Sequence, residues 1–354
     1  MRVLQVAPPW FTVPPTGYGG TEQVVALLTD GLVRRGHAVT LLAAGGSDTA
    51  ATLWTTFEAP PTRQLGDPAI ELTHVLSGYR ERDAFDLIHD HTTTGAALGS
   101  MPGGPPVVHT LHGPWTSASS GFYAAVSPYI DLVAISHDQA DRAPAGIRVA
   151  AVVHNGIDVD AHPFVATKGD HLAFLGRANL EKGPELAIEV ARRLDRRLLM
   201  GVKVNEPGEH DYFAAHIAPA LRHGDVELVP VTTHAEKYEL LGAAAAVLFP
   251  VTWAEPFGLV PVEASACGTP VVAFAKGGLW ETVEHGRNGF LVESGNLEAF
   301  CAAVEHTSEL DPRTCRHVAR ERFDATRMVA GYEGIYRNLV EGGACTEREV
   351  SSPA

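Results

Sequence analysis

The sequence is poor in cysteine and lysine for its length of 354 residues. Its four cysteines are Cys267, Cys301, Cys315 and Cys345, and no two have the C-x-x-C spacing of a zinc or redox site. We expect reduced thiols, the first three on helices and Cys345 in the tail, because such scattered cysteines are typical of a reducing compartment. We therefore expect neither a disulfide framework nor a zinc site.

Positive charge and long apolar runs are scarce as well. Lys and Arg number 27 against 42 Asp and Glu, which gives a formal net charge of −15. This balance argues against nucleic acid as a partner and against docking on anionic membranes. No run of 18 apolar residues occurs, and residues 1–6 resemble a first strand rather than a signal peptide. We therefore expect a cytoplasmic protein without membrane association.

The apolar content, 45% of residues, is sufficient for more than one core. A chain of this length exceeds the usual size of one domain. In the first half, strands are expected at 3–7, 38–43, 87–89, 107–111, 132–135 and 149–153. A helix is expected at 21–35, with Thr21 as its N-cap and Gly36 as its stop. This alternation predicts a doubly wound parallel sheet.

The pattern restarts after a polar linker that ends near Asp170. Strands are expected at 172–175, 198–201, 226–229, 247–249, 271–274 and 290–292, and helices at 185–194, 235–246 and 325–339. We place one Rossmann-like domain at 1–160 and a second at 161–324. A C-terminal helical segment follows at 325–341, and a flexible tail at 342–354. The predicted fold class is α/β.

Two glutamates eight positions apart flank an expected helix N-terminus. Glu255 lies in a loop, and the helix starts near Leu259. The free N–H groups after Gly258, including those of Leu259 and Val260, suit a phosphate. Glu263 lies one turn into the helix, so the two carboxylates are placed to bind different parts of one ligand. An acidic loop before an ordinary helix is the alternative.

The full string at 255–273 is Glu-Pro-Phe-Gly-Leu-x-x-x-Glu-Ala-x-Ala-x-Gly-Thr-Pro-Val-Val-Ala. It closely resembles the E-x7-E motif of retaining glycosyltransferases of family 4, which include sucrose synthase and many bacterial mannosyl- and glucosyltransferases. The resemblance implies the GT-B architecture, in which two Rossmann-like domains face each other across a cleft and the last helix crosses back to the first domain. It makes 1–160 the acceptor-side domain and 161–324 the nucleotide-sugar domain. It also implies that Glu255 faces the donor sugar, while the reach of Glu263 favours the ribose.

A long loop at 8–21 carries Gly17, Gly19 and Gly20, which allow close approach to a ligand. Their G-x-G-G spacing is not the dinucleotide fingerprint, and a simple flexible loop is the alternative. The family places such a loop beside the donor phosphates and the acceptor.

Arg177 and Lys182 follow the strand at 172–175, at the edge where open α/β sheets bind ligands. Two cations there would balance a diphosphate as it leaves. The alternative is a pair of solvated charges, but the chain contains only five lysines. The string 176–183 resembles the family's G-R-x-x-x-x-K-G motif, whose Arg and Lys grip the diphosphate.

Histidines follow several of the expected strands and add to the candidate residues. His112 follows the strand at 107–111, where the family carries a histidine that touches the donor sugar. We expect His89 and His91 to point to opposite faces, so zinc is not predicted there, and the segment is assigned to the acceptor side. His154, in a string that resembles the family's linker signature, is expected to be structural.

Residues 277–281 resemble the family's G-G-x-x-E segment. The backbone N–H groups of Gly277 and Gly278 are expected to bind sugar hydroxyls. Trp280 replaces the more usual proline, and it either alters the sugar pocket or packs against the next helix.

The resemblance implies a retaining transfer of a hexose from a nucleotide sugar, and the acidic surface favours a small soluble acceptor over a lipid. Family frequency favours UDP-glucose or UDP-N-acetylglucosamine over GDP-mannose. The catalytic candidates are Arg177, Lys182, Glu255 and His112. No Asp-x-Asp motif ends a strand, so neither a metal nor a cofactor is expected beyond the co-substrate. The alternatives are a sugar-nucleotide 2-epimerase and a catalytically silent nucleotide-sugar binder.

Overall fold

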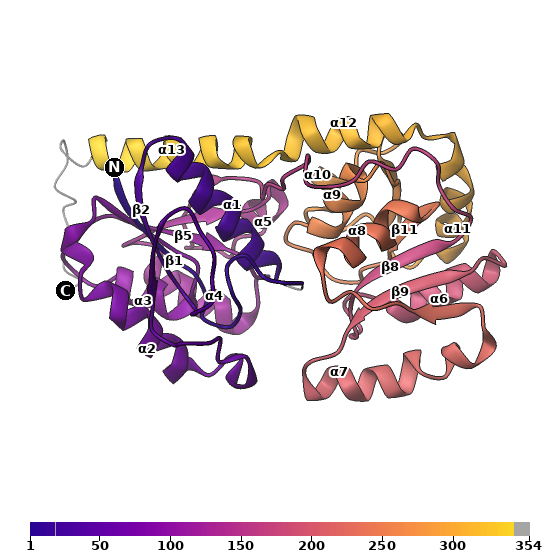
Figure 1. Cartoon of the computed structure of the whole chain (residues 1–354), viewed down its shortest axis with the longest axis horizontal. Coiled ribbons are helices and arrows are strands. Elements are labelled where there is room, and N and C mark those ends of the chain that lie inside the picture. The colour runs from indigo at the N-terminus through magenta and orange to yellow at the C-terminus, as the bar shows by residue number, and fades with distance from the viewer. Residues whose placement is uncertain (18, 343–354) are drawn as a thin grey trace.

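The computed structural model describes residues 1–17 and 19–342, which form two α/β domains side by side (Figure 1). Within these residues the first sheet has seven parallel strands in the order β3-β2-β1-β4-β5-β6-β7. The strands are β1 (Arg2–Val6), β2 (Ala38–Ala43), β3 (Thr52–Thr55), β4 (Leu87–Asp90), β5 (Val107–Leu111), β6 (Asp131–Ala134) and β7 (Val149–Val152). The helices between them are α1 (Gly20–Arg34), α2 (Pro68–Tyr79), α3 (Thr93–Gly99), α4 (Ser117–Val126) and α5 (His137–Asp141).

The second sheet has six parallel strands in the described chain, in the order β10-β9-β8-β11-β12-β13. They are β8 (Leu172–Arg177), β9 (Leu198–Lys203), β10 (Val226–Leu228), β11 (Ala246–Phe249), β12 (Val271–Phe274) and β13 (Gly289–Val292). The helices are α6 (Pro184–Arg193), α7 (Pro207–Tyr212), α8 (His234–Ala243), α9 (Leu259–Ala266), α10 (Leu279–Thr282), α11 (Leu297–His306) and α12 (Pro312–Phe323). This doubly wound α/β arrangement confirms the predicted fold class.

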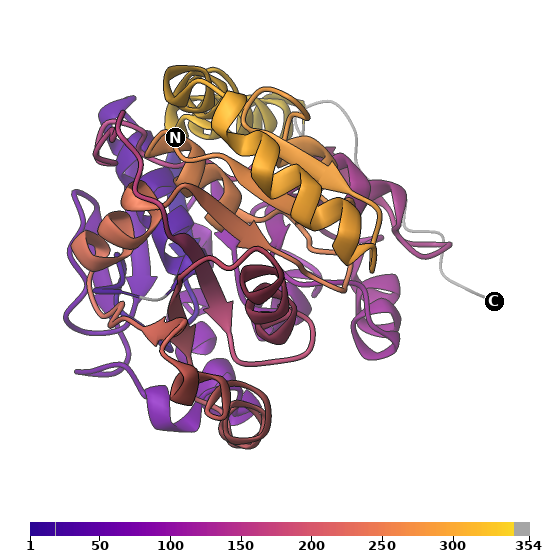
Figure 2. The ribbon, with the colours of Figure 1, turned by 90° about the vertical axis from the view of Figure 1, so that its right-hand side faces the viewer.

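Both faces of each sheet are buried by helices. Successive residues of a strand point to opposite faces, so each strand contributes to two hydrophobic cores. In β1, Val3 packs with Leu28 of α1, whereas Leu4 packs with Val75 of α2. The second sheet is covered by α6 and α11 on one face and by α8 and α9 on the other. Figure 2, which views the molecule from the second domain, shows helices on both sides of these strands. Buried parallel strands of this kind read as continuous apolar runs.

Local features differ from the sequence predictions in three places. The edge strand β3 was not predicted, because it is short and only partly buried. Thr21 is not the N-cap of α1, since Gly19 holds that position without a side-chain cap and Thr21 lies in the first turn. The helix expected at 235–246 ends at Ala243, because Ala246 already belongs to β11.

The last helix, α13 (Ala325–Gly342), crosses from the second domain and packs on α1 of the first (Figure 1). A Cβ added at Gly31 would clash with Val329, so glycine permits the close approach of these two helices. Glu333 accepts a hydrogen bond from Arg35 Nε at 2.7 Å and lies 3.0 Å from His37 Nε2. The predicted flexible tail lies outside the described residues except for Gly342, as does Cys345.

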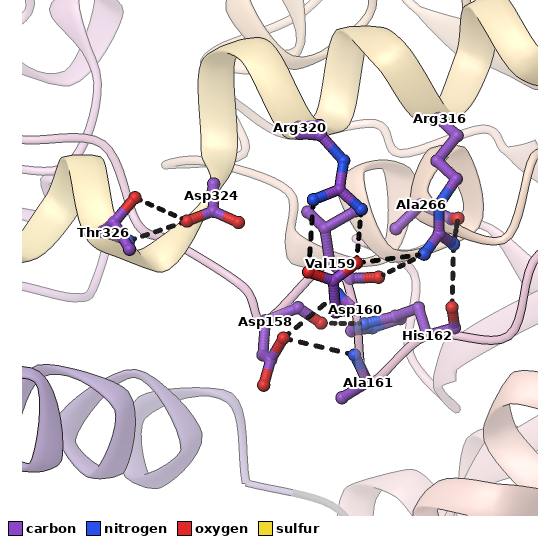
Figure 3. A network of polar contacts seen from close by, with 10 residues as sticks. All are labelled: Asp158, Val159, Asp160, Ala161, His162, Ala266, Arg316, Arg320, Asp324 and Thr326. Carbon is purple, nitrogen blue, oxygen red and sulfur yellow. Dashed lines mark hydrogen bonds and ion pairs between the residues drawn. The ribbon is translucent and has the colours of Figure 1, made fainter.

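The linker between the domains is anchored on α12 (Figure 3). Arg316 donates to the carbonyl oxygens of His162 at 2.8 Å, Ala266 at 2.6 Å and Val159 at 2.9 Å. Arg320 forms an ion pair with Asp160. From about Val159 onward, the linker is therefore attached to the second domain.

The chain crosses between the domains twice, and the two crossings lie side by side. Ile157 N–H donates to the carbonyl oxygen of Phe323, and Ala325 N–H donates to that of Ile157, both at 2.9 Å. These paired segments form the covalent connection between the two domains. In the described residues, no helix combines the length and the apolar character needed to span a membrane.

Candidate functional site

A cleft of about 890 Å³ lies between the two domains, at the edge where the sheets have their carboxyl ends. Ligands of open α/β sheets bind at this edge, and the volume suits a small-molecule ligand. Most of the predicted site residues line the cleft: Gly17, Gly19, Gly20, His112, Arg177, Lys182, Glu255, Gly258, Leu259, Val260 and Glu263. Residues separated by up to 246 positions in sequence (17 to 263) thus share one cavity.

Glu255 is held firmly at the cleft wall. Its Oε2 accepts hydrogen bonds from Lys182 Nζ at 2.5 Å and from Trp253 Nε1 at 2.9 Å. Lys182 Nζ also lies over the ring of Trp253, 5.0 Å from its centroid. Both charged side chains are largely buried, with 17% of Lys182 and 12% of Glu255 exposed. The sequence predicted each residue but not their direct ion pair.

Gly277 and Gly278 support Glu255 from behind and, in the described chain, do not line the cleft. Gly278 N–H donates to the carbonyl oxygen of Glu255 at 2.7 Å, so the prediction that this N–H binds a sugar hydroxyl is wrong. Gly277 adopts φ 61°, and a Cβ there would clash with the backbone of Glu255. The two glycines therefore allow one loop to pack on the other. Trp280 is 62% exposed and lines neither described cavity.

Glu263 lies on α9, whose N-cap Gly258 adopts the left-handed conformation with φ 93°. Its Oε1 accepts from Lys237 Nζ of α8 at 2.6 Å. Sequence reasoning missed Lys237, although it is one of only five lysines. The free N–H groups at the start of α9 lie in the sequence between the two carboxylates, where an anionic group is favoured by the helix dipole.

Arg177 ends β8 and pairs with carboxylates that the sequence analysis did not identify. Its Nη2 donates to Glu206 Oε1 at 2.6 Å, and its Nε donates to Glu209 of α7. Burial alone would raise the pKa of Glu209, but hydrogen bonds from the Asn205 N–H and from Arg177 outweigh it and lower the pKa. The guanidinium is thereby held at the cleft wall that also carries Lys182.

His112 belongs to a buried chain of polar groups that begins at α13. His91 Nδ1 lies 2.9 Å from His112 Nε2, and His91 Nε2 lies 3.0 Å from Gln5 Oε1. Because an amide oxygen only accepts, His91 carries its proton on Nε2 and His112 Nε2–H donates to His91 Nδ1. Desolvation lowers the pKa of His112 to about 4, so the ring is neutral and its Nδ1 is a hydrogen-bond acceptor.

The expectation for His89 and His91 was wrong. Their ring centroids lie only 4.1 Å apart, because residues i and i+2 of an extended segment share a face. His89 Nδ1 lies 2.5 Å from the Tyr336 hydroxyl, and His89 Nε2 lies 2.7 Å from the Thr110 hydroxyl. These contacts account for His89 as a structural link between β4, β5 and α13.

The loop after β1 reaches across the cleft to the second domain. His234 Nε2 lies 3.0 Å from the carbonyl oxygen of Pro15, and Lys203 Nζ lies over the Phe11 ring at 5.5 Å. A Cβ at Gly17 would clash with the carbonyl of Thr232, so this glycine permits the contact. The loop thus closes one side of the cavity.

Glu22, in the first turn of α1, is a buried carboxyl that sequence reasoning also missed. It lines the cleft and is 5% exposed. Burial raises its pKa to about 7, partly offset by its own backbone N–H and by Lys203. A carboxyl that is half protonated near neutrality repels a nearby phosphate less than an ionised one does.

One group among the described residues, His137, His154 and Glu281, brings enough ligand atoms together to hold a metal ion. Hydrogen bonds to Glu281 explain why these residues lie close together. His154 Nε2 lies 2.6 Å from Glu281 Oε2, and the N–H groups of His137 and Asp138 donate to Glu281 at 2.9 Å. The group joins α5 to α10 and lies outside the cleft lining. His154 is therefore structural at the domain boundary.

In the described site the cations all lie on one domain, whereas carboxylates line the cleft from both. The lysines and the arginine that line the cleft all belong to the second domain, and each lies against a carboxylate or an aromatic ring. Such an array can bind a diphosphate at the start of α9 while the carboxylates accept hydrogen bonds from hydroxyl groups on either side. The first domain adds a neutral imidazole acceptor.

Two protein families match this chain, one over each domain. The family described as Glycosyl transferases group 1 matches residues 161–322, and Glycosyltransferase Family 4 matches residues 18–161. The D-inositol 3-phosphate glycosyltransferase of Mycobacterium sp. (strain KMS) is 28% identical over 280 residues, 67% of this chain. The match spans only 62% of that relative's own length.

Solved structures agree over nearly the whole chain. AviGT4, a glycosyltransferase involved in avilamycin A biosynthesis, is 26% identical, with a TM-score of 0.74 and coverage of 96% of this chain and 98% of that one. The HepE protein of Anabaena, in complex with UDP-glucose, is 20% identical with a TM-score of 0.73, covering 96% of this chain and all of its own. The second likeness concerns the fold alone.

Proposed function

Because the chain belongs to the GT-B glycosyltransferases of family 4, we propose that it is a retaining hexosyltransferase with a UDP-linked donor and a small acceptor. One observation carries this proposal. Arg177, Lys182, Glu255 and Glu263 converge on one cleft, with the N-terminus of α9 between the two glutamates in the chain. That set contains partners for a diphosphate, a sugar and a ribose.

In the proposed reaction the bond between the anomeric carbon and the diphosphate oxygen breaks, and a bond to the acceptor oxygen forms on the same face of the sugar. The electron pair of the broken bond leaves with the diphosphate, which also takes the acceptor's proton. Arg177 and Lys182 stabilise the negative charge that develops there. Glu255 and the free Nδ1 of His112 orient the sugar by accepting hydrogen bonds from its hydroxyls.

We propose that the reaction needs no divalent metal, since two preorganised cations serve the leaving diphosphate. A uridine donor is proposed from the family resemblance, and the fold of HepE accommodates UDP-glucose. A small acceptor is proposed from the acidic composition of the chain, with its formal net charge of −15. A cytoplasmic location stays a prediction.

The test incubates the full chain with UDP-glucose, UDP-N-acetylglucosamine or GDP-mannose, with and without acceptors and excess EDTA. Mass spectrometry detects transfer, and NMR reports the anomeric configuration and distinguishes C2 epimers. We expect acceptor-dependent transfer with retained anomeric configuration that persists in EDTA. Conversion of the sugar without an acceptor would indicate a 2-epimerase. Binding without any conversion would indicate a silent binder.

Matched variants check the assignment of the cations. Arg177→Ala and Lys182→Ala should each lower the rate by about 10²–10³-fold, as loss of one preorganised donor typically does. Arg193→Ala is the control, because Arg193 pairs with Glu189 on α6 and does not line the cleft. Near-normal rates in both site variants would remove these cations from the mechanism.

A further inference from the structure

The two walls of the cleft differ in charge. Among the described residues, its cations are Arg177, Lys182, Lys203 and Lys237, all on the second domain, whose lining also includes Glu181, Glu206, Glu255 and Glu263. The described first-domain residues that line the cleft include no lysine or arginine, and their charged members are Glu22 and Glu71. The sequence agrees, because no lysine occurs before Lys168.

The second-domain cations are already assigned to the donor. Lys182 and Lys237 pair with the two glutamates, and Arg177 lies between Glu206 and Glu209. A bound nucleotide sugar adds a diphosphate to this wall. A second anionic group, on the acceptor, would then face the diphosphate on one side and acidic side chains on the other.

Glu71 is suited to recognise a hydrogen-bond donor. It is half-buried on α2, and its Oε2 accepts the N–H of Thr94 at 2.9 Å in the first turn of α3. A carboxylate has about four acceptor sites, so this bond leaves capacity for a ligand. Trp10 and Leu65 line the same wall and supply apolar surface of the kind that packs on sugar rings.

We propose that the acceptor is a saccharide-like molecule without phosphate or carboxylate, and that Glu71 accepts a hydrogen bond from one of its hydroxyl or ammonium groups. This inference rests on the proposed function, because it concerns the acceptor of that reaction. It separates this chain from the similar D-inositol 3-phosphate glycosyltransferases, which are named for a phosphorylated polyol.

An arginine of the first domain lies in an adjoining cavity of about 500 Å³. Arg142 lines that cavity with Trp115, and its Nε donates to Asp138 Oδ2 at 2.7 Å. Because Arg142 does not line the main cleft, we do not assign it to an acceptor anion. A variant of Arg142 therefore belongs in the test.

The experiment compares matched acceptors on the full wild-type chain. The panel pairs myo-inositol with inositol 3-phosphate, and methyl glucoside with glucose 6-phosphate and with methyl 2-amino-2-deoxyglucoside. Binding to UDP-loaded protein is measured by calorimetry, and transfer is measured with the donor identified above. We expect each phosphate-free member to bind at least tenfold more tightly than its phosphorylated partner. The amino sugar distinguishes an ammonium contact, which would improve binding further, from a hydroxyl contact.

Two variants test whether Glu71 contacts the acceptor. Glu71→Gln, which keeps an oxygen for the Thr94 N–H, should weaken acceptor binding about tenfold while UDP affinity stays unchanged. Arg142→Ala should leave the acceptor preference as it is. The proposal is overturned if phosphorylated members bind best, if no panel member binds, or if Glu71→Gln leaves acceptor affinity intact. Failure to bind UDP would instead overturn the proposed function.

Discussion

At the scale of single residues, the two glutamates of the cleft have different partners and should have different tasks. Glu263 pairs with Lys237 on α8, whereas Glu255 pairs with Lys182 in the loop after β8. We predict that Glu263→Gln weakens binding of free UDP as well as of the donor, because the ribose is common to both. Glu255→Gln should leave UDP affinity nearly intact and lower sugar transfer.

Calorimetry and initial rates measure this division of tasks. A lost carboxylate hydrogen bond to a ligand hydroxyl costs about 1.5–3 kcal/mol, roughly tenfold or more in affinity. The opposite pattern, in which Glu255→Gln loses UDP affinity and Glu263→Gln keeps it, would show that the two assignments are reversed.

Glu22 predicts a pH dependence of stability. Its folded-state pKa is raised from 4.5 to about 7 by burial, so the folded protein holds a proton that the unfolded chain releases. The stability contribution of this group is full below pH 4.5 and falls as the pH rises to about 7. Above that pH the ionised carboxylate costs roughly 3 kcal/mol.

Glu22→Gln removes this penalty, so it should stabilise the protein at pH 8 by much more than at pH 5. Thermal unfolding of wild type and variant at the two pH values measures the difference. An equal shift in Tm at both values would mean that Glu22 is ionised normally in the folded state.

At the scale of elements, the loop before α10 positions the loop that carries Glu255. Gly277 has φ 61°, and an added Cβ would collide with the Glu255 backbone. We predict that Gly277→Ala lowers sugar transfer at least tenfold while UDP affinity changes little, because the Glu255 loop must move whereas α9 need not. Initial rates and calorimetry with UDP measure the two effects.

Gly286→Ala is the matched control for this variant. Gly286 also has a positive φ, 79°, but a Cβ there meets nothing within 4 Å. Both changes carry the left-handed backbone strain of about 1 kcal/mol, and only the first displaces the site. Equal losses of transfer in the two variants would attribute the effect to backbone strain alone.

At the scale of the whole molecule, Arg316 holds the interdomain linker on the second domain (Figure 3). Its guanidinium donates to three carbonyl oxygens, on His162, Ala266 and Val159. We predict that Arg316→Ala lowers the free energy of unfolding by about 2–3 kcal/mol or more, since hydrogen bonds to a charged group are the strong ones. Urea denaturation measures the change.

Arg320→Ala provides the comparison on the same helix. Arg320 pairs with Asp160 in solvent, where an ion pair contributes little. The free energy of unfolding should therefore stay nearly unchanged. If the two variants were equally destabilised, the loss would belong to α12 itself rather than to its hold on the linker.

Local signals in the sequence were enough to determine the α/β class and most of the parallel strands. Buried strands are continuous apolar runs, and glycine or proline marks where helices begin and end, as Pro184 and Gly268 do. The sequence also singled out Glu255, Glu263, Arg177 and Lys182, which share one cleft, because they stand in short strings whose spacing resembles a family motif. These features depend only on residues that are close together in the sequence.

Only the tertiary structure decided which groups meet. Lys182 and Glu255 are 73 positions apart, and Lys237 and Glu263 are 26 apart, so no local pattern predicts their ion pairs. The proton arrangement at His112 depends on Gln5, over 100 positions earlier, and the raised pKa of Glu22 depends on burial under the closing loop. Gly278 was misassigned because its N–H is used by a carbonyl that only the packed loops bring near. Pairing, burial and protonation are properties of the folded chain, since each requires segments that folding alone places side by side.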